Sequence, residues 1–323
     1  MDYLLKFFTG QVQYNRLVFS GGGIKGICFC GVLLELDQRG ILYDTEKKLK
    51  IDSICGVSAG SIIAALFAVG YTPNEIKDIM FSINLEKISN DGNSYIGETE
   101  NIIEGWGTCQ GNYIQELLGN LIKEKTGNYN YTFTDLYKEK GIELVILATN
   151  ISDKKVDYFY HGHSNEIYSN TPIIQAVRMS MSIPGIFEPY HFNESLYVDG
   201  GVLDNYPLYV FDGKSPDDPD ARLNLCKPNM SVIGVRIMTP DRVQDYNSIG
   251  DESINSLYGY INAIVNTILI DNERKNMTPS YWERSIIVIT PDYPISKFTL
   301  TTEEKDELIN AGKQYTAKFF DKK

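Results

Sequence analysis

The pentapeptide Gly56–Gly60, which reads Gly-Val-Ser-Ala-Gly, places the strongest constraint on how this chain can fold. A short, largely apolar run precedes it over residues 51–55, and an alanine-rich apolar run follows over residues 61–69 and ends at Gly70. These runs predict a buried strand and then a helix. Gly-x-Ser-x-Gly in that context is typical of a nucleophile elbow, where glycines permit a sharp turn. We therefore expect Ser58 to present its hydroxyl at a helix N-terminus, which stabilises a developing anion; the alternative is a chance glycine-rich turn.

A second glycine-rich segment, Gly21–Gly26, reads Gly-Gly-Gly-Ile-Lys-Gly and follows an apolar run over residues 17–19. Consecutive glycines let backbone N–H groups approach a ligand, so beside Ser58 this loop would form an oxyanion hole. The alternative, a phosphate cradle for a nucleotide, lacks both the P-loop and the dinucleotide-binding patterns. Lys25 is unusual near a helix N-terminus, and we expect it to pair with an acidic side chain or with a lipid phosphate. The candidate oxyanion donors are the N–H groups of Gly21, Gly22, Gly23 and Ala59.

The third signal is Asp199, which ends a short predicted strand and precedes Gly200 and Gly201. A carboxylate at that position would accept the proton of Ser58. Aspartate is a weak base, with an ordinary pKa near ~3.9, so partial burial would have to raise its pKa. A histidine base would be the usual expectation, but the three histidines stand in polar or proline-flanked segments and are interpreted as loop residues: His161, His163 and His191.

The order of predicted elements indicates an α/β fold, because strands alternate with helices as in parallel sheets with crossover helices. We expect one domain over residues 1–323, with the core motifs in 16–240 and a helix/strand/helix extension in 241–323. The predicted strands cover residues 17–19, 51–55, 142–149, 156–160, 196–198, 231–237 and 285–290. The predicted helices cover residues 27–40, 61–69, 73–81, 112–125, 173–181, 253–271 and 302–319.

Composition excludes several classes of protein. The chain has 323 residues, 43% of them hydrophobic, which is enough for a sizeable core, and its net charge of −12 argues against a nucleic-acid partner. The five cysteines have no metal-site spacing and are interpreted as reduced thiols. No cluster of potential ligands predicts a metal, and no cofactor is expected. No apolar run approaches the ~20 residues of a membrane span, and the start is too short for a signal peptide, so a cytoplasmic protein is expected.

The three motifs together resemble those of the patatin-like phospholipase family. Gly21–Gly26 matches the family's oxyanion motif, Gly56–Gly60 its nucleophile motif, and Asp199-Gly200-Gly201 its Asp-Gly-Gly/Ala motif. Two flanking segments match as well, namely Ser180–Pro189 and Asn205–Pro207, so the resemblance covers residues 16–210. Met179 stands where the family often has alanine, a departure that concerns packing only. The residues expected to support these motifs are Lys25, Gly26, Gly56, Gly60, Gly200 and Gly201.

The resemblance implies a three-layer α/β/α fold with a mainly parallel sheet and a Ser58–Asp199 dyad that needs neither histidine nor metal. It implies a lipid acyl hydrolase of phospholipase A type, acting on phospholipid or acylglycerol at a peripheral membrane surface. Transacylation, triacylglycerol hydrolysis and a catalytically idle lipid-binding role remain alternatives, and a serine peptidase shares only the Gly-x-Ser-x-Gly pattern. The oligomeric state is left open.

Three further segments are candidates for contact with lipid. Residues 89–111 are polar and rich in turn signals, which predicts a long loop that serves as a lid over the acyl channel. Within it, Trp106 either closes over a fatty chain or pins the loop to the core. Phe187 either docks on a lipid surface or belongs to the core, and residues 1–10 either anchor at an interface or pack on the domain.

Overall fold

The structure is a computed structural model that describes residues 13–83, 106–239, 277–291 and 299–322, together with isolated positions between 87 and 297. The possible anchor at residues 1–10 and most of the possible lid, residues 89–105, lie outside the described residues. So does part of the expected helix over residues 253–271, of which the described positions between 259 and 268 are helical.

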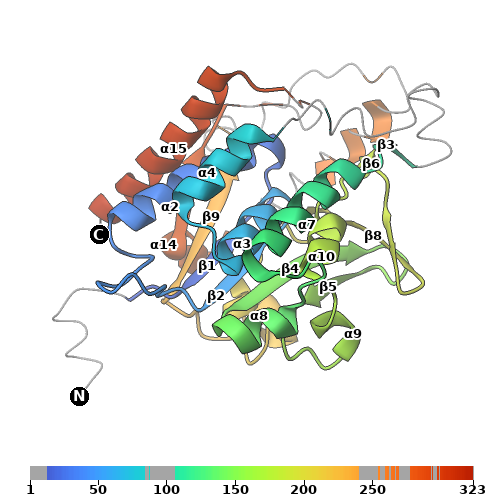
Figure 1. Cartoon of the computed structure of the whole chain (residues 1–323), viewed down its shortest axis with the longest axis horizontal. Coiled ribbons are helices and arrows are strands. Elements are labelled where there is room, and N and C mark those ends of the chain that lie inside the picture. Colours follow the sequence, from blue (N-terminus) through green and yellow to red (C-terminus); the bar gives the residue numbers. More distant parts are fainter. Residues whose placement is uncertain are drawn as a thin grey trace.

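The core is an eight-stranded sheet in which five neighbouring strands are parallel and three are antiparallel (Figure 1). The parallel strands lie in the order β10 (Ser285–Ile289), β9 (Val232–Met238), β1 (Arg16–Phe19), β2 (Ser53–Gly56) and β4 (Glu143–Asn150). Three strands pair antiparallel to their neighbours. β5 (Lys155–Phe159) lies on the side of β4 opposite β2, whereas β8 (Ser195–Asp199) pairs with the end of β4 on the same side as β2 and carries β7 (Tyr190–Phe192). The prediction of a mainly parallel sheet is confirmed.

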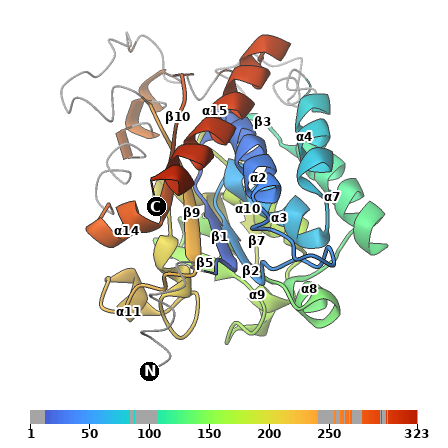
Figure 2. The ribbon, with the colours of Figure 1, turned by 90° about the vertical axis from the view of Figure 1, so that its left-hand side faces the viewer.

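Alternate residues of each strand enter two separate hydrophobic cores, one on each face of the sheet. In β1, Leu17 and Phe19 join the larger core and Val18 joins the smaller one, as the two-residue repeat of a strand requires. The smaller core is closed by η3 (Leu208–Phe211), α11 (Pro219–Arg222) and α14 (Pro279–Arg284). Figure 2 shows α11 and α14 on one side of the strands and α2, α3, α4 and α7 on the other. The three-layer α/β/α prediction is confirmed.

Among the described residues, nine helical segments cover the larger core. They are η1 (Gly23–Ile27), α2 (Cys28–Gln38), α3 (Ala59–Val69), α4 (Pro73–Ser82), α7 (Asn112–Thr126), α8 (Phe133–Lys140), α9 (Glu166–Ser169), α10 (Ile173–Ser180) and α15 (Thr302–Asp321). Three of these helices begin with a capping box, in which a threonine and the acidic residue three positions later satisfy each other's N–H groups. None of the helices in the described part of the chain is long and apolar enough to cross a membrane.

A second, two-stranded sheet corrects part of the predicted lid. β3 (Gly107–Cys109) pairs in parallel with β6 (Gly185–Phe187), so the last residues of the expected loop form a strand. Trp106 precedes β3 with a positive φ of 61° and is 55% exposed, so the interpretation that it pins the loop to the core is wrong. Whether residues 89–105 form a lid stays a prediction.

The C-terminal helix α15 lies directly against α2 through two glycines, Gly31 and Gly312. A Cβ on Gly31 would overlap the carbonyl oxygen of Ile309, and one on Gly312 would overlap that of Cys28. The two backbones therefore pack closer than side chains would permit. This contact joins the C-terminal part of the chain to the first helix after the glycine loop.

We expect Gly312→Val to lower the free energy of unfolding by about 1–3 kcal/mol or more, because the added atoms must push α15 away from α2. Asn310→Val is the matched control, since it introduces the same side chain at an exposed position of the same helix. Its effect should stay within about 0.5 kcal/mol. Urea unfolding of both variants measures the difference, and equal effects would show that the glycine contact does not hold the helix in place.

Candidate active site

Ser58 occupies a sharp turn between β2 and α3. Its backbone angles, φ 51° and ψ −126°, lie outside the regions that non-glycine residues prefer, a type of strain that clusters at functional sites. The turn is tight because Gly60 passes against β1: a Cβ there would lie 2.5 Å from the carbonyl oxygen of Ser20. The Ser58 N–H donates to the hydroxyl of Ser180 at 2.9 Å, which holds the turn against α10. The predicted strand–turn–helix context is confirmed.

The register of the sheet brings Asp199 level with Ser58. Gly56 lies beside Ile146 of β4, and two residues further along β4, Ala148 pairs with Asp199 of β8. Ser58 follows Gly56 by two residues, so it reaches the same level. The Ser58 hydroxyl donates a 2.6 Å hydrogen bond to Oδ2 of Asp199. These two residues, 141 positions apart in the sequence, are therefore in direct contact.

Asp199 is almost completely buried, at 3% exposure. Burial raises its pKa from 3.8 to about 7, because the ionised form loses its hydration, while the hydrogen bonds from Ser58 and from the Gly201 N–H lower it. The Gly201 N–H donates to Oδ1 at 2.7 Å, and the Asp199 N–H donates to the carbonyl of Ser182 at 2.8 Å. The carboxylate is thus fixed at both oxygens and poised to change its protonation state near neutral pH.

The glycine loop runs beside the elbow. A Cβ on Gly21 would lie 3.2 Å from the Cβ of Ser58, and one on Gly26 would lie 2.8 Å from the Cβ of Ala59. Gly23 adopts a positive φ of 54°, where glycine is strongly favoured. The Gly21 N–H donates to the carbonyl of Asn205 at 3.1 Å, so this N–H already serves the protein. The structure therefore brings all three predicted motifs together at one end of the sheet.

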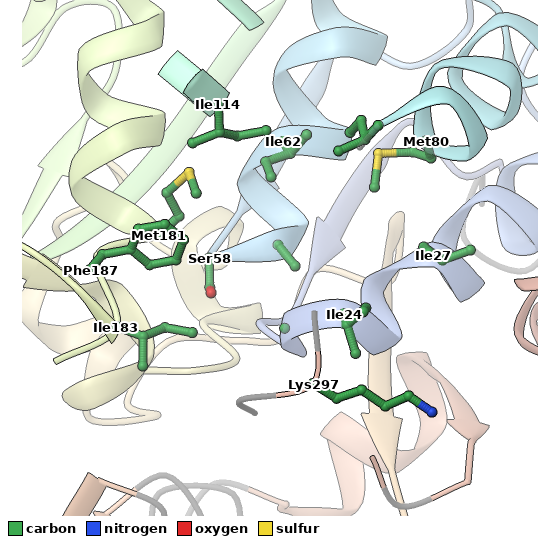
Figure 3. A pocket seen from close by; sticks show the side chains of 13 residues that line it. Ile24, Ile27, Ser58, Ile62, Met80, Ile114, Met181, Ile183, Phe187 and Lys297 are labelled. Atoms are coloured by element: carbon green, nitrogen blue, oxygen red, sulfur yellow. The ribbon is translucent and has the colours of Figure 1, made fainter. Parts of the chain in front are cut away.

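A narrow apolar cavity of about 100 Å³ opens at Ser58 (Figure 3). Aliphatic, aromatic and methionine side chains form most of its wall, with Ile62 and Ile114 on one side of Ser58 and Ile183 and Ile24 on the other. Phe187 is 4% exposed and lines this cavity, so it is not a surface docking residue. The cavity is bounded by Gly23, Ile24, Ile27, Ser58, Ala59, Ile62, Met80, Ile83, Ile114, Met181, Ile183, Phe187 and Lys297.

The three histidines lie elsewhere. His161 stacks on Tyr137 with ring centroids 4.1 Å apart, and Nε2 of His163 lies 3.5 Å from a carboxylate oxygen of Asp217. His191 is exposed on β7, at the edge of the sheet. None of them lines the cavity, but the interpretation of all three as loop residues is wrong for His191, which lies in the strand β7. Within the described residues, no group of three or more potential metal ligands lies together.

Sequence reasoning missed several residues that support the site. The Ser180 hydroxyl and the Ser182 carbonyl hold the backbones of Ser58 and Asp199, and the Asn205 carbonyl holds the glycine loop. All three lie in the flanking segments that supported the resemblance. The sequence therefore indicated that these segments belong near the site, but not which contacts the three residues make. Lys297 lines the cavity from a loop far along the chain, and no pattern in the sequence indicates it.

Comparison with known proteins agrees with the fold and the motifs. A viral relative, protein R571 of Acanthamoeba polyphaga mimivirus, is 31% identical over 94% of this chain and 92% of its own length. The "Probable lipid hydrolase 463L" of Invertebrate iridescent virus 6 is 34% identical over 61% of this chain and 63% of its length. VipD from Legionella pneumophila, a crystal structure, superposes with a TM-score of 0.59 at 16% identity over 97% of this chain and 67% of VipD.

The sequence model described as patatin-like phospholipase matches residues 17–212, a span that includes the glycine loop, Ser58 and Asp199. The match extends over more than half of the chain and ends directly after η3. The chain belongs to the patatin-like phospholipase family.

Proposed function

We propose that this protein hydrolyses fatty acyl esters of phospholipids through a Ser58–Asp199 dyad. The observation that carries the proposal is the 2.6 Å hydrogen bond between Ser58 and a buried carboxylate at a mainly apolar cavity. Membership of the patatin-like phospholipase family and the lipid-hydrolase name of a viral relative support the same class of substrate. An acyl chain in the cavity would place its ester carbonyl beside the Ser58 hydroxyl.

In the first step the Ser58 oxygen attacks the ester carbonyl while Asp199 accepts the hydroxyl proton. The pKa of Asp199, raised to about 7 by burial, makes this carboxylate a far better base than an exposed aspartate. Collapse of the tetrahedral intermediate breaks the ester C–O bond, and the proton on Asp199 passes to the leaving alcohol. The product at this stage is an acyl-enzyme on Ser58.

In the second step Asp199 takes a proton from water, the hydroxide attacks the acyl-enzyme, and Ser58 recovers its proton as the fatty acid leaves. The oxyanion of both intermediates would be held by N–H groups of Gly22, Gly23 and Ala59. Gly23 and Ala59 line the cavity and stand in the first turns of η1 and α3, where N–H groups lack intrahelical partners. Because the Gly21 N–H serves Asn205, we assign Gly21 to close packing against Ser58 instead.

The substrate would be taken from a lipid surface. Trp106 is a suitable contact residue, because it is half exposed and precedes β3, whose partner β6 carries Phe187 in the wall of the cavity.

Transacylation uses the same acyl-enzyme with a lipid alcohol in place of water. Mass spectrometry of products from mixed phospholipids and acylglycerols in ¹⁸O-labelled water distinguishes hydrolysis from transacylation. Labelled fatty acid supports hydrolysis, whereas acyl transfer without label, or no product that depends on Ser58, contradicts it.

The cavity also predicts a chain-length effect. Ile62 lies one turn after the elbow on α3 and faces the cavity beside Ser58 (Figure 3). Ile62→Phe should fill part of the space and lower kcat/KM for long acyl chains by about tenfold or more, as lost apolar contacts do. Hydrolysis of an acetyl or butyryl ester by the same variant is the internal control and should change little. A uniform loss across chain lengths would show that the chain does not run past Ile62.

A further inference from the structure

Lys297 is the single charged residue among the described residues that line the Ser58 cavity. Figure 3 shows its aliphatic stem across the opening from Ile62 and Ile114, with the ammonium directed away from the cavity. Lysine commonly buries its stem along apolar surface while its charge stays near water. Lys297 therefore places a cation at the rim of a cavity whose other walls suit an acyl chain.

The Lys297 ammonium is held by the carboxylate of Glu304, which also caps the N-terminus of α15. Nζ of Lys297 lies 2.6 Å from Oε1 of Glu304, whose Oε2 accepts the Thr301 N–H at 2.9 Å in the capping box of α15. The ammonium also lies 4.3 Å from the ring centroid of Tyr293. An ammonium has three N–H donors, so Lys297 can keep Glu304 and still donate to a second anion.

The chain contains a second copy of this arrangement, which shows what is special about Lys297. Lys125 pairs with Glu75 at 2.8 Å, Glu75 closes the capping box of α4, and the Lys125 ammonium lies 4.4 Å from the ring of Tyr71. The two lysines have similar exposure, 25% and 27%. Lys125 does not line the Ser58 cavity, whereas Lys297 does. The lysine–glutamate pair and the capping box therefore have a structural role at both places. What distinguishes Lys297 from Lys125 is its position at the Ser58 cavity.

We propose that Lys297 binds the phosphate of a phospholipid head group at the rim of the cavity and so selects phospholipids over neutral acylglycerols. This inference rests on the proposed function, in which the acyl chain fills the apolar part and the ester lies at Ser58. A phosphate attached to the same glycerol would then emerge where the ammonium stands. The charge on Lys297 acts on the phosphate and leaves the ester chemistry to Ser58 and Asp199. Neutral acylglycerols offer the lysine no anion, so they gain nothing from it.

The test compares Lys297→Gln with Lys125→Gln on two water-soluble substrates of equal acyl length, dihexanoyl phosphatidylcholine and dihexanoylglycerol, both below their aggregation limits. Loss of a charge-assisted hydrogen bond should lower kcat/KM for the phospholipid by about tenfold and leave the diacylglycerol almost unchanged. Lys125→Gln should leave the ratio of the two activities as in the wild type. Lys297→Arg keeps the cation and should retain most of the preference. Inorganic phosphate, added as a competitor, shows whether the site takes phosphate without the attached lipid.

The outcomes separate this inference from the proposed function. If Lys297→Gln lowers both activities equally, the lysine only supports α15 and the head-group site is disproved. If the ratio does not change while hydrolysis still requires Ser58, the inference fails and the proposed function stands. If Ser58→Ala retains full activity on both lipids, the proposed function itself fails. Competition by inorganic phosphate in the wild type that disappears in Lys297→Gln would support a phosphate site at this residue.

Discussion

Ser58→Ala and Asp199→Asn should each reduce hydrolysis of a soluble short-chain ester by about 10³-fold or more. Removal of a nucleophile or of its base costs factors of this size in serine hydrolases that work through a covalent intermediate. In this chain the two side chains share one hydrogen bond, so loss of either removes the same proton transfer. The double variant should therefore be about as inactive as the single variants, because residues that act as a unit are not additive.

Two controls make this result specific. Far-ultraviolet circular dichroism and thermal unfolding should show that both variants remain folded, since each change removes or replaces only a few atoms. Replacement of each histidine by alanine should preserve most of the activity, because none of the three lines the cavity: His161, His163 and His191. Loss of several orders of magnitude in any histidine variant would overturn the dyad.

The second large effect concerns pH. In the proposed mechanism activity requires ionised Asp199, whose pKa burial raises to about 7, so kcat/KM should fall about tenfold per pH unit below that value. Between pH 8 and pH 5 the expected loss is about 100-fold. The rate profile of the free enzyme on a soluble ester measures it, with circular dichroism at each pH to exclude unfolding. A profile that is flat down to pH 5 would show that the base is a carboxyl with an ordinary pKa.

The same carboxyl should make the protein less stable as pH rises. The folded pKa of Asp199 lies above the ordinary value of ~3.9 for an unfolded chain, so the folded state binds more protons between about pH 4 and pH 7. The ionised form therefore opposes folding, fully so above pH 7 and not at all below pH 4. Asp199→Asn should consequently gain stability relative to the wild type as pH rises through this range, while remaining inactive.

The sequence predicted most of the long strands and helices, because these depend on local patterns, but it did not predict the short strands β3, β6 and β7 or the helix α8. Apolar runs predicted β1, β2 and β4, and the glycines around Ser58 predicted a turn that the structure contains. The contact between Ser58 and Asp199 was also expected, but through family resemblance and not through any property of two residues so far apart. The assignment of one domain over the whole chain, and the roles of the site residues, stay predictions.

What the sequence could not supply are relations that exist only after folding. Nothing local shows that β9 lies beside β1, or that the Asn205 carbonyl accepts the Gly21 N–H. Phe187 is a further example. An apolar residue near proline and glycine can lie on the surface or line a buried cavity, and only the packing of the folded chain determines which of the two positions it takes. In the sequence, nothing distinguishes Lys297 from any other lysine that precedes a predicted helix. Its significance depends on α15 lying against α2.

The position of β1 in the sheet has a consequence for translation. β1 leaves the ribosome long before one of its two neighbours, β9, which begins only at Val232. Until then the nascent chain carries an apolar strand with one open edge, a template for pairing with other chains. A fragment that stops at residue 212, where the family match ends, keeps that edge open permanently. Such a fragment should aggregate. Heterologous expression of a soluble protein that contains Ser58 and Asp199 therefore requires β9 and β10 as well.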